Sequence, residues 1–403
     1  MSAWREAARR FAFVEYDGPP LEPLELYTKK SGEEIVGQLY NFTDKGSREI
    51  SLRPEMTPTL ARMAAAKANA LRKPIRWFSM PQLFRYERQQ RGRLREHFQL
   101  NVDIIGEADV TADAELLAVA IEVMRVCGLT QNDVRARVSD RRLLRAILAS
   151  LGVNDDQAPA VFGVIDKFER QPRDVSREKL GTIGVKGTEV DALFHLLSEN
   201  TLDHIEQQFA NAPGVAEWLT GLRRYFDYLD GLGVLDWVTV DLKIVRGLAY
   251  YTGIVFELFD ARGELRAICG GGRYDNLLQS LGGVNLPALG FGMGDVVLGE
   301  LLRDRGLLPS SVAAPDVWVA GESAALERDV RRAATALRRI GVSVEYALRE
   351  QAIMKQVKAA KSAGATRILT LHDPSTKPAT ERHSWSTPDV PPEWDALLRD
   401  IDL

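Results

Sequence analysis

Short apolar runs bounded by turn residues dominate the first hundred residues, and they constrain the fold more than any other feature. Most are four to eight residues long and rich in β-branched or aromatic types. Such runs are typical of strands, and the absence of a long crossover between some neighbours favours antiparallel pairing in one sheet. The predicted strands cover 38–43, 48–52, 75–85 and 98–105, and the predicted helices cover 57–67 and 112–127.

Other parts of the chain have a different texture. Trp4, Ala7, Ala8 and Phe11 recur at helical spacing, which predicts a helix over 3–12. Residues 132–231 are helix-rich and charged with few strand signals, which is typical of an insertion. Strand patterns return over 237–246, 250–259 and 267–269, followed by a glycine-rich turn and a helix over 294–305. These late strands should complete the sheet.

A small-residue linker at 310–315 separates these segments from the C-terminal part of the chain, in which strand and helix patterns alternate as β-α-β-α-β. This alternation predicts a small α/β domain, although no strand is readable after Pro374. The predicted division is a first part of the main domain at 1–131, a helix-rich insertion at 132–231, a second part at 232–309 and a C-terminal domain at 315–403.

Composition excludes several classes of protein. With 45% hydrophobic and 27% charged residues, the 403-residue chain is neither disordered nor fibrous as a whole. No apolar stretch approaches the ~18 residues of a membrane span, and the N-terminus does not read as a signal peptide, so we expect a cytoplasmic protein with no membrane partner. Cys127 and Cys269 are too far apart in sequence to suggest a zinc site, and the five histidines form no motif. We therefore predict no metal site.

One segment is strongly basic although the chain carries a net charge of −4. Residues 72–95 hold eight Lys or Arg and one acid, Glu87. A hairpin here, with its turn at 89–92, would place Arg85 and Arg95 on adjacent strands. Several arginines on one hairpin suit a polyphosphate, because each guanidinium binds phosphate bidentately. A solvated charged hairpin is the simpler reading of the charge alone.

Five short segments, taken together and in this order, resemble the class II histidyl-tRNA synthetase family. They are Ser51-Leu52-Arg53-Pro54-Glu55-Met56-Thr57, Phe84-Arg85-Tyr86-Glu87-Arg88, Phe98-Gln99-Leu100-Asn101-Val102-Asp103, Val245-Arg246-Gly247-Leu248-Ala249-Tyr250-Tyr251-Thr252-Gly253 and Gly270-Gly271-Gly272-Arg273-Tyr274-Asp275. The resemblance implies an α+β fold, with an antiparallel sheet flanked by helices, a helical insertion and a C-terminal anticodon-binding α/β domain. It also implies a histidine–tRNA ligase that makes histidyl-adenylate from ATP and transfers histidine to the 3′ end of tRNA(His).

The resemblance assigns roles in ATP binding and catalysis. Arg85 and Arg246 would be the catalytic arginines at the α-phosphate, where charge neutralisation matters most. Mg²⁺ would arrive with ATP rather than in a protein cage. The ATP-binding set is Arg85, Glu87, Arg93, Arg95, His97 and Arg246, and the tRNA acceptor end would meet Arg88 and Gln90.

The amino-acid pocket follows from the same resemblance. Carboxylate, hydroxyl and amide oxygens suit the ammonium of histidine, whereas a carboxylate with tyrosines suits its imidazole. The implied histidine-binding set is Glu55, Thr57, Gln99, Asp103, Tyr250, Tyr251 and Tyr274. Read singly, Tyr251 and Tyr274 would be ordinary core aromatics, and Arg246 a structural arginine.

The sequence departs from the family pattern at the adenine site. Val297 stands where the third class II motif carries an arginine, and His97 stands where an aromatic residue is expected, next to Phe98. These departures keep a second reading open, that of a non-catalytic, histidine-sensing regulatory subunit of ATP phosphoribosyltransferase. A third is a degenerate paralogue that binds an amino acid or RNA. Residues 13–25 resemble motif 1, which implies a homodimer, with the helix over 4–11 packing at the same interface.

Overall fold

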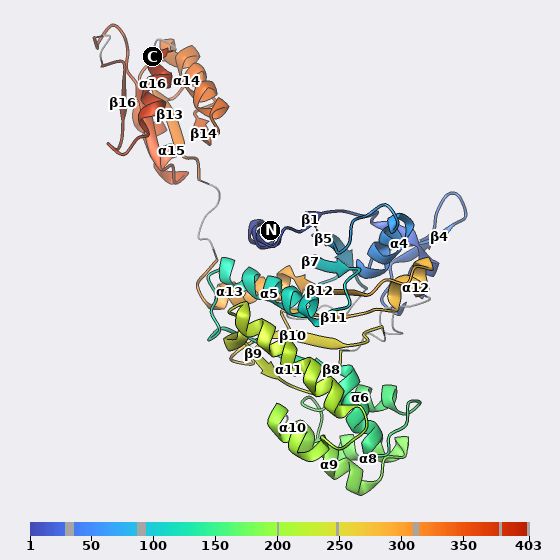
Figure 1. Cartoon of the computed structure of the whole chain (residues 1–403). Helices are drawn as coiled ribbons and strands as arrows, with labels where there is room; N and C mark the ends of the chain where they lie inside the picture. The colour runs from blue at the N-terminus through green and yellow to red at the C-terminus, as the bar shows by residue number, and fades with distance from the viewer. Residues whose placement is uncertain are drawn as a thin grey trace. The chain divides into compact units, whose positions relative to one another are not determined.

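The computed structural model describes residues 1–28, 36–86, 94–199, 201–246, 250–308, 314–378 and 381–400, and these form two compact units. The first unit spans Met1–Leu308 and the second spans Pro309–Leu403. Figure 1 shows both units with their elements labelled.

A nine-stranded sheet organises the first unit. Its strands pair antiparallel except at the two edges, where β1 pairs with β5 and β8 with β9 in parallel. The predicted antiparallel sheet is therefore confirmed. In spatial order the strands are β1 (Val14–Glu15), β5 (Ile75–Ser79), β7 (Glu96–Ile105), β12 (Ala288–Gly294), β11 (Cys269–Arg273), β10 (Ile254–Asp260), β8 (Val134–Asp140) and β9 (Val238–Val240), with β6 (Gln82–Phe84) paired to β7 off this path.

The two faces of this sheet differ in chemistry. Alternate residues of β7, among them Leu100, Val102 and Ile104, are buried with Phe291 of β12 in the main apolar core. Helix α5 (Val110–Val126) covers this face, and helix α1 (Ser2–Arg10) packs on α5. The intervening residues of β7, including Asp103, point to the opposite face, because side chains alternate along a strand.

The opposite face is covered only in part. Helix α4 (Thr57–Lys67) and helix α12 (Leu277–Gly282) pack together over it, with Leu60 and Leu277 in a second apolar cluster. Tyr251 and Tyr274 belong to the same cluster. Helix α13 (Asp295–Asp304) follows β12 and contacts β7.

Two expectations about the early strands are corrected by the structure. The runs at 38–43 and 48–52 do not join the main sheet, because they form a separate three-stranded sheet in the order β2-β4-β3. The run at 75–85 is two strands interrupted at Met80-Pro81, where proline cannot donate a ladder hydrogen bond. The elements of this small sheet region are β2 (Leu21–Pro23), α2 (Leu24–Thr28), β3 (Asn41–Thr43) and β4 (Glu49–Leu52).

The segment at 132–231 is mostly helical, but it begins with a strand that the sequence analysis did not predict. Strand β8 pairs with β10 over seven residues, so the sheet already includes Val134–Asp140. The Arg and Ser residues of this strand made it resemble the charged helices that follow. Helices then follow, of which α8, α9 and α10 lie together beyond the β8 and β9 edge of the sheet (Figure 1). They are α6 (Arg141–Ser150), α7 (Ala158–Ile165), α8 (Arg173–Ile183), α9 (Gly187–Ser198), α10 (Leu202–Phe209), α11 (Val215–Gly231) and the 3-10 turn η1 (Leu235–Trp237).

The C-terminal unit contains the predicted β-α-β-α-β alternation in a four-stranded sheet of order β14-β13-β15-β16. The structure contains a strand after Pro374 that could not be read from the sequence, since β16 pairs antiparallel with β15. Only three residues long, β16 is too short to leave a periodic signal. The elements are β13 (Val317–Gly321), η2 (Ala324–Leu326), α14 (Glu327–Arg339), β14 (Val344–Tyr346), α15 (Ile353–Ser362), β15 (Arg367–Leu371), β16 (His383–Trp385) and α16 (Pro392–Asp400).

Candidate active site

Glycines form a bare floor at the centre of the main sheet. Gly270 of β11 pairs with Gly292 of β12, and Gly272 pairs with Gly290 one step along. The expected glycine-rich turn is therefore wrong, because all three glycines at 270–272 lie inside β11. A strand glycine commonly marks a place where another group approaches the backbone closely. Here that place is the same face of the sheet as Asp103.

Three polar side chains lie over this floor. A Cβ on Gly290 would overlap Oδ1 of Asp103, and one on Gly292 would lie 2.8 Å from the side chain of Gln99. A Cβ on Gly270 would overlap Nη1 of Arg246. Any side chain at these glycines would displace the polar groups, so the positions of Asp103, Gln99 and Arg246 depend on glycine at 290, 292 and 270.

Asp103 is the most perturbed acid on this face. Its side chain is almost fully buried, and it accepts a hydrogen bond from the hydroxyl of Tyr274. Burial raises the pKa of the Asp103 carboxyl to about 7, although the Tyr274 hydrogen bond opposes the shift. A buried carboxyl with a shifted pKa beside a bare floor is a candidate for ligand binding.

Glu55 forms a second acidic position nearby, in the connection between β4 and α4. It is buried, and its Oε2 accepts a hydrogen bond of 3.2 Å from the hydroxyl of Tyr250. The ring of Tyr250 lies 5.1 Å from that of Tyr251 and 5.9 Å from that of Tyr274. Thr57 opens α4 and lies within hydrogen-bonding reach of Tyr250. The tyrosines therefore connect the two buried acids.

Arg246 is held in an unusual backbone conformation. Its φ is +58°, a left-handed value that a residue with a Cβ adopts at a cost. Nη1 donates to Oε1 of Glu257 on β10, and the guanidinium lies over the ring of Tyr251 at 5.8 Å. The Nε–H is buried and has no hydrogen-bond partner among the residues that the structure describes. A half-buried guanidinium whose buried Nε–H is unused suits an anionic ligand.

The two strands predicted to flank the basic turn do pair, since β6 lies antiparallel to β7, and the predicted turn at 89–92 lies outside the described residues. The backbone N–H of Arg85 donates to the carbonyl of Arg95 at 2.9 Å, and Arg85 Nε donates to the carbonyl of Pro54 at 2.9 Å. Arg95 lies 4.4 Å from the ring centre of Tyr86. Burial, with the positive charge of Arg85, lowers the pKa of His97 to about 4, so His97 is neutral near pH 7. The predicted positions Glu87, Arg88, Gln90 and Arg93 lie outside the described residues.

Two groups of residues at the site were not assigned a role from sequence. The first is Glu257, which pairs with Arg246. The second is the pair Gly290 and Gly292, over which the side chains of Asp103 and Gln99 lie. The spacing of the glycines was a usable signal, since glycines two residues apart on neighbouring strands share one face. Val297 is 9% exposed and lies in the main apolar core.

The histidines are less scattered than the sequence suggested. Donor atoms of His195, Glu199 and His204 lie within 4.8 Å of one another, and the two imidazole rings stack at 5.1 Å. Nδ1 of His204 is 3.9 Å from Oε2 of Glu199, so a carboxylate–imidazole contact accounts for part of this cluster. The group lies at the junction of α9 and α10, outside the sheet that carries Asp103.

Within the described ranges, no helix is long and apolar enough to cross a membrane.

The sequence matches the family described as histidyl-tRNA synthetase over residues 5–294. It is 46% identical to the histidine–tRNA ligase of Opitutus terrae over 371 residues, which is 91% of this chain and 84% of that protein. It is 41% identical to the chloroplastic/mitochondrial histidine–tRNA ligase of Arabidopsis thaliana, over 91% of this chain and 75% of that protein.

Solved structures share the fold. The histidyl-tRNA synthetase from Nostoc sp. PCC 7120 superposes with a TM-score of 0.81 at 22% identity, covering 99% of this chain and 94% of that one. A protein from Bacillus halodurans, described as an ATP phosphoribosyltransferase regulatory subunit/histidyl-tRNA synthetase, gives 0.75 at 22% identity over 92% and 93%. The predicted class II α+β architecture is thus confirmed, and the chain belongs to the histidyl-tRNA synthetase family.

Proposed function

We propose that this chain is a histidine–tRNA ligase, which activates histidine with ATP and transfers it to the 3′ end of tRNA(His). Relatives with that name match most of the chain at 40% identity or more, which supports an aminoacyl-tRNA ligase. The observation that carries the proposal is the glycine floor, with Asp103 at one point and Arg246 at another. It brings a cation-binding or hydrogen-bonding acid and an anion-binding arginine onto one face.

The pocket suits histidine in its polar groups. Asp103, with Tyr274, would pair with the imidazole, because an acid and a hydroxyl satisfy two ring nitrogens. Glu55, Thr57 and Gln99 would bind the ammonium, and Tyr250 and Tyr251 would enclose the side chain. Such a site rejects apolar amino acids, since they would leave its buried polar groups unpaired.

The arginines suit the phosphates of ATP. Arg246 would hold the histidine carboxylate and the α-phosphate through its unused Nε–H, and Arg85 would face the same phosphate from the hairpin. Adenylate formation needs these charges in place before reaction, so that developing negative charge meets fixed donors. His97, Arg95, Glu87 and Arg93 complete the proposed ATP set. Mg²⁺ would enter bound to ATP as part of the substrate.

RNA recognition and assembly belong to the same proposal. Arg88 and Gln90 would contact the acceptor end, and the C-terminal unit would bind the anticodon. We propose a homodimer through the segment 13–25, where Val14 and Leu21 are exposed. The proposed interface does not use the apolar face of α1, since Trp4, Ala7 and Ala8 are buried in this chain's own core. A cytoplasmic location remains a prediction.

A histidine-sensing regulatory subunit is the second candidate. The observation that favours it is Val297, a buried apolar residue at the position where an adenine-stacking arginine was expected. The two functions differ in chemistry, because a sensor needs the histidine pocket but not the phosphate-binding arginines.

Histidine-dependent exchange of pyrophosphate with ATP separates these functions. A ligase forms the adenylate reversibly, so labelled pyrophosphate should enter ATP only when histidine is present. Charging of tRNA(His) with labelled histidine then tests the second step. Histidine binding without any exchange would sink the ligase proposal and favour the sensor.

A further inference from the structure

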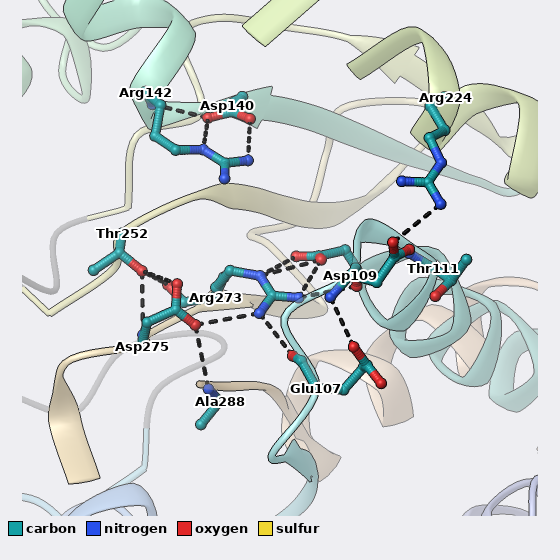
Figure 2. A network of polar contacts seen from close by, with 11 residues as sticks. Glu107, Asp109, Thr111, Asp140, Arg142, Arg224, Thr252, Arg273, Asp275 and Ala288 are labelled. Atoms are coloured by element: carbon teal, nitrogen blue, oxygen red, sulfur yellow. Dashed lines mark hydrogen bonds and ion pairs between the residues drawn. The ribbon is translucent and has the colours of Figure 1, made fainter. Parts of the chain in front are cut away.

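Arg273 lies on the helix-covered face of β11, one residue before Tyr274, and its side chain is 3% exposed. Every N–H group of its guanidinium has a partner, as Figure 2 shows for the labelled residues. Nε donates to Asp113 at 3.2 Å, Nη2 to Asp113 at 2.5 Å and to the carbonyl of Asp109 at 3.3 Å, and Nη1 to the carbonyl of Glu107 at 2.9 Å and to Asp275 at 3.2 Å.

Asp275 extends this network to the tyrosine segment. The hydroxyl of Thr252 donates to Asp275 Oδ2 at 3.3 Å, and the backbone N–H of Asp275 lies 3.2 Å from the same hydroxyl oxygen. The backbone N–H of Thr252 donates to the carbonyl of Arg273 at 2.8 Å. Thr252 directly follows Tyr251, so the segment with Tyr250 and Tyr251 is fastened to the segment with Tyr274.

Close packing reinforces the same connection. A Cβ on Gly253 would lie 3.2 Å from Cδ of Arg273 and 3.4 Å from Cζ of Arg142. Arg142 is itself fixed by Asp140, to which its Nη2 donates at 2.6 Å. The backbone after Tyr251 therefore lies close to two arginines, each of which is held by an acid.

A role in stability alone is a weak explanation for this network. Burying an ion pair costs desolvation, and an apolar pair of similar size is often as stabilising. The Arg273 network instead ends on two residues that adjoin the proposed pocket tyrosines, Asp275 beside Tyr274 and Thr252 beside Tyr251. Full satisfaction of all five N–H groups leaves the guanidinium one geometry, which is what a support for precise side-chain placement requires.

We propose that Arg273 is a positioning residue for the amino-acid pocket, acting from behind the sheet through Asp113, Asp275 and Thr252. It sets where Tyr274 meets Asp103 and where Tyr251 meets the ligand. The inference rests on the proposed function, because it takes the tyrosine pocket to be the histidine site. Its signature is a defect in histidine binding with ATP binding left intact.

Arg273→Lys is the informative variant, because lysine keeps the charge but cannot reproduce the five-donor fork. Arg305→Lys is a matched control, since the Arg305 side chain is only 8% exposed and also pairs with two acids, Asp133 and Asp260. We expect Arg273→Lys to weaken histidine binding by at least about tenfold in calorimetry, as small misplacements of binding groups do, with KM for ATP within about twofold. Arg305→Lys should lower the melting temperature without changing histidine affinity.

A lowered melting temperature with wild-type histidine affinity in Arg273→Lys would overturn the inference. If that variant fails to fold, Asp275→Asn and Thr252→Val test the same connection from its half-buried end, and both should raise the histidine Kd while leaving KM for ATP unchanged. Unaltered histidine affinity in both would overturn it equally. If the wild-type protein binds no histidine, the proposed function itself is refuted. If the wild-type protein and the variants bind histidine equally well, only the role of Arg273 is refuted.

Discussion

The hydroxyl of Tyr274 donates a hydrogen bond to the carboxylate of Asp103, and both side chains are almost completely buried. This contact joins two segments 171 residues apart in the chain. Because Asp103 also lies directly over Gly290, the carboxylate has little room to move. The pair is therefore a rigid recognition element whose charge depends on pH.

The Asp103 carboxyl gives folding stability a predictable pH dependence. Its folded pKa of about 7 lies above the usual value of 3.8, so the folded state keeps a proton that the unfolded state has lost between these values. This contribution to stability is fully present below pH 3.8 and is lost as the pH rises through 7. Asp103→Asn should remove this pH dependence. The free energy of unfolding of the variant should therefore rise relative to that of wild type by at most about 4 kcal/mol between about pH 4 and pH 8.

Denaturant unfolding at several pH values measures this difference, and Asp133→Asn is the control of opposite sign. Burial raises the pKa of Asp133, but hydrogen bonds from Thr130 and Arg305 outweigh it and lower the pKa overall. Asp133→Asn should therefore lose stability relative to wild type as the pH rises. If the difference in unfolding free energy between wild type and Asp103→Asn is flat with pH, the assignment of the raised pKa to Asp103 is refuted.

The same acid should determine amino-acid selectivity. We expect wild-type protein to prefer histidine over leucine or phenylalanine by about 10⁴, because apolar side chains leave Asp103 and Tyr274 unpaired. In Asp103→Asn this preference should shrink by at least about tenfold, since the amide replaces an ionisable acceptor with a weaker one. Calorimetric titration with each amino acid measures both, and equal affinities in wild type would contradict the pocket assignment.

Arg246→Ala tests the proposed phosphate contact. Removing a preorganised positive charge should lower histidine-dependent pyrophosphate exchange by about 10²–10³. The variant also leaves Glu257 without its ion-pair partner. The double variant Arg246→Ala/Glu257→Gln removes that unpaired acid and should recover stability but not exchange. Recovery of exchange in the double variant would mean that Arg246 serves only to neutralise Glu257.

Sequence patterns located the longer helices and strands β5, β7 and β10, because their apolar faces are long enough to show a period. They predicted no strand at β12 and a glycine-rich turn in place of most of β11. Helix α4 has the predicted bounds of 57–67. β8 was missed because four of its seven residues are Arg, Ser or Asp, and the strand β16 because it has only three residues. Burial of polar residues in a sheet is a tertiary effect that local composition does not report.

The site shows the same division. Family motifs named Asp103, Tyr274 and Arg246, and the structure brings them onto one face of the sheet. The motif also contained Arg273, but nothing in the sequence indicated its partners, since Asp113 lies 160 residues away on α5. Long-range polar pairs of this kind depend on the strand register, so a single sequence could not have predicted them.

Exposed apolar residues near the N-terminus predict the effect of charge on the proposed dimer. Val14 is 61% exposed and Leu21 is 42% exposed, within the segment that resembles an interface motif. If this segment forms the dimer, Val14→Asp/Leu21→Asp should shift the mass in light scattering from about twice the chain mass toward 44.8 kDa. Leu232→Asp, 39% exposed and outside the segment, should leave the mass unchanged. A wild-type monomer would exclude the dimer.

Val297→Arg asks whether the adenine site can accept the arginine that the family pattern predicts. The sequence alone predicts a modest gain in ATP affinity, or none if helix packing refuses the longer side chain. The structure favours the second result, because Val297 is 9% exposed in the core against which α13 packs. Forcing a longer charged side chain into a packed core typically costs about 1–3 kcal/mol or more. We therefore expect a lower melting temperature and no gain in ATP binding by calorimetry.

Val296→Arg, at a partly exposed neighbouring position of α13, is the control and should be tolerated. If Val297→Arg instead folds normally and binds ATP more tightly, the new arginine contacts the nucleotide. The absence of an arginine at this position would then account for weak ATP binding in the native chain.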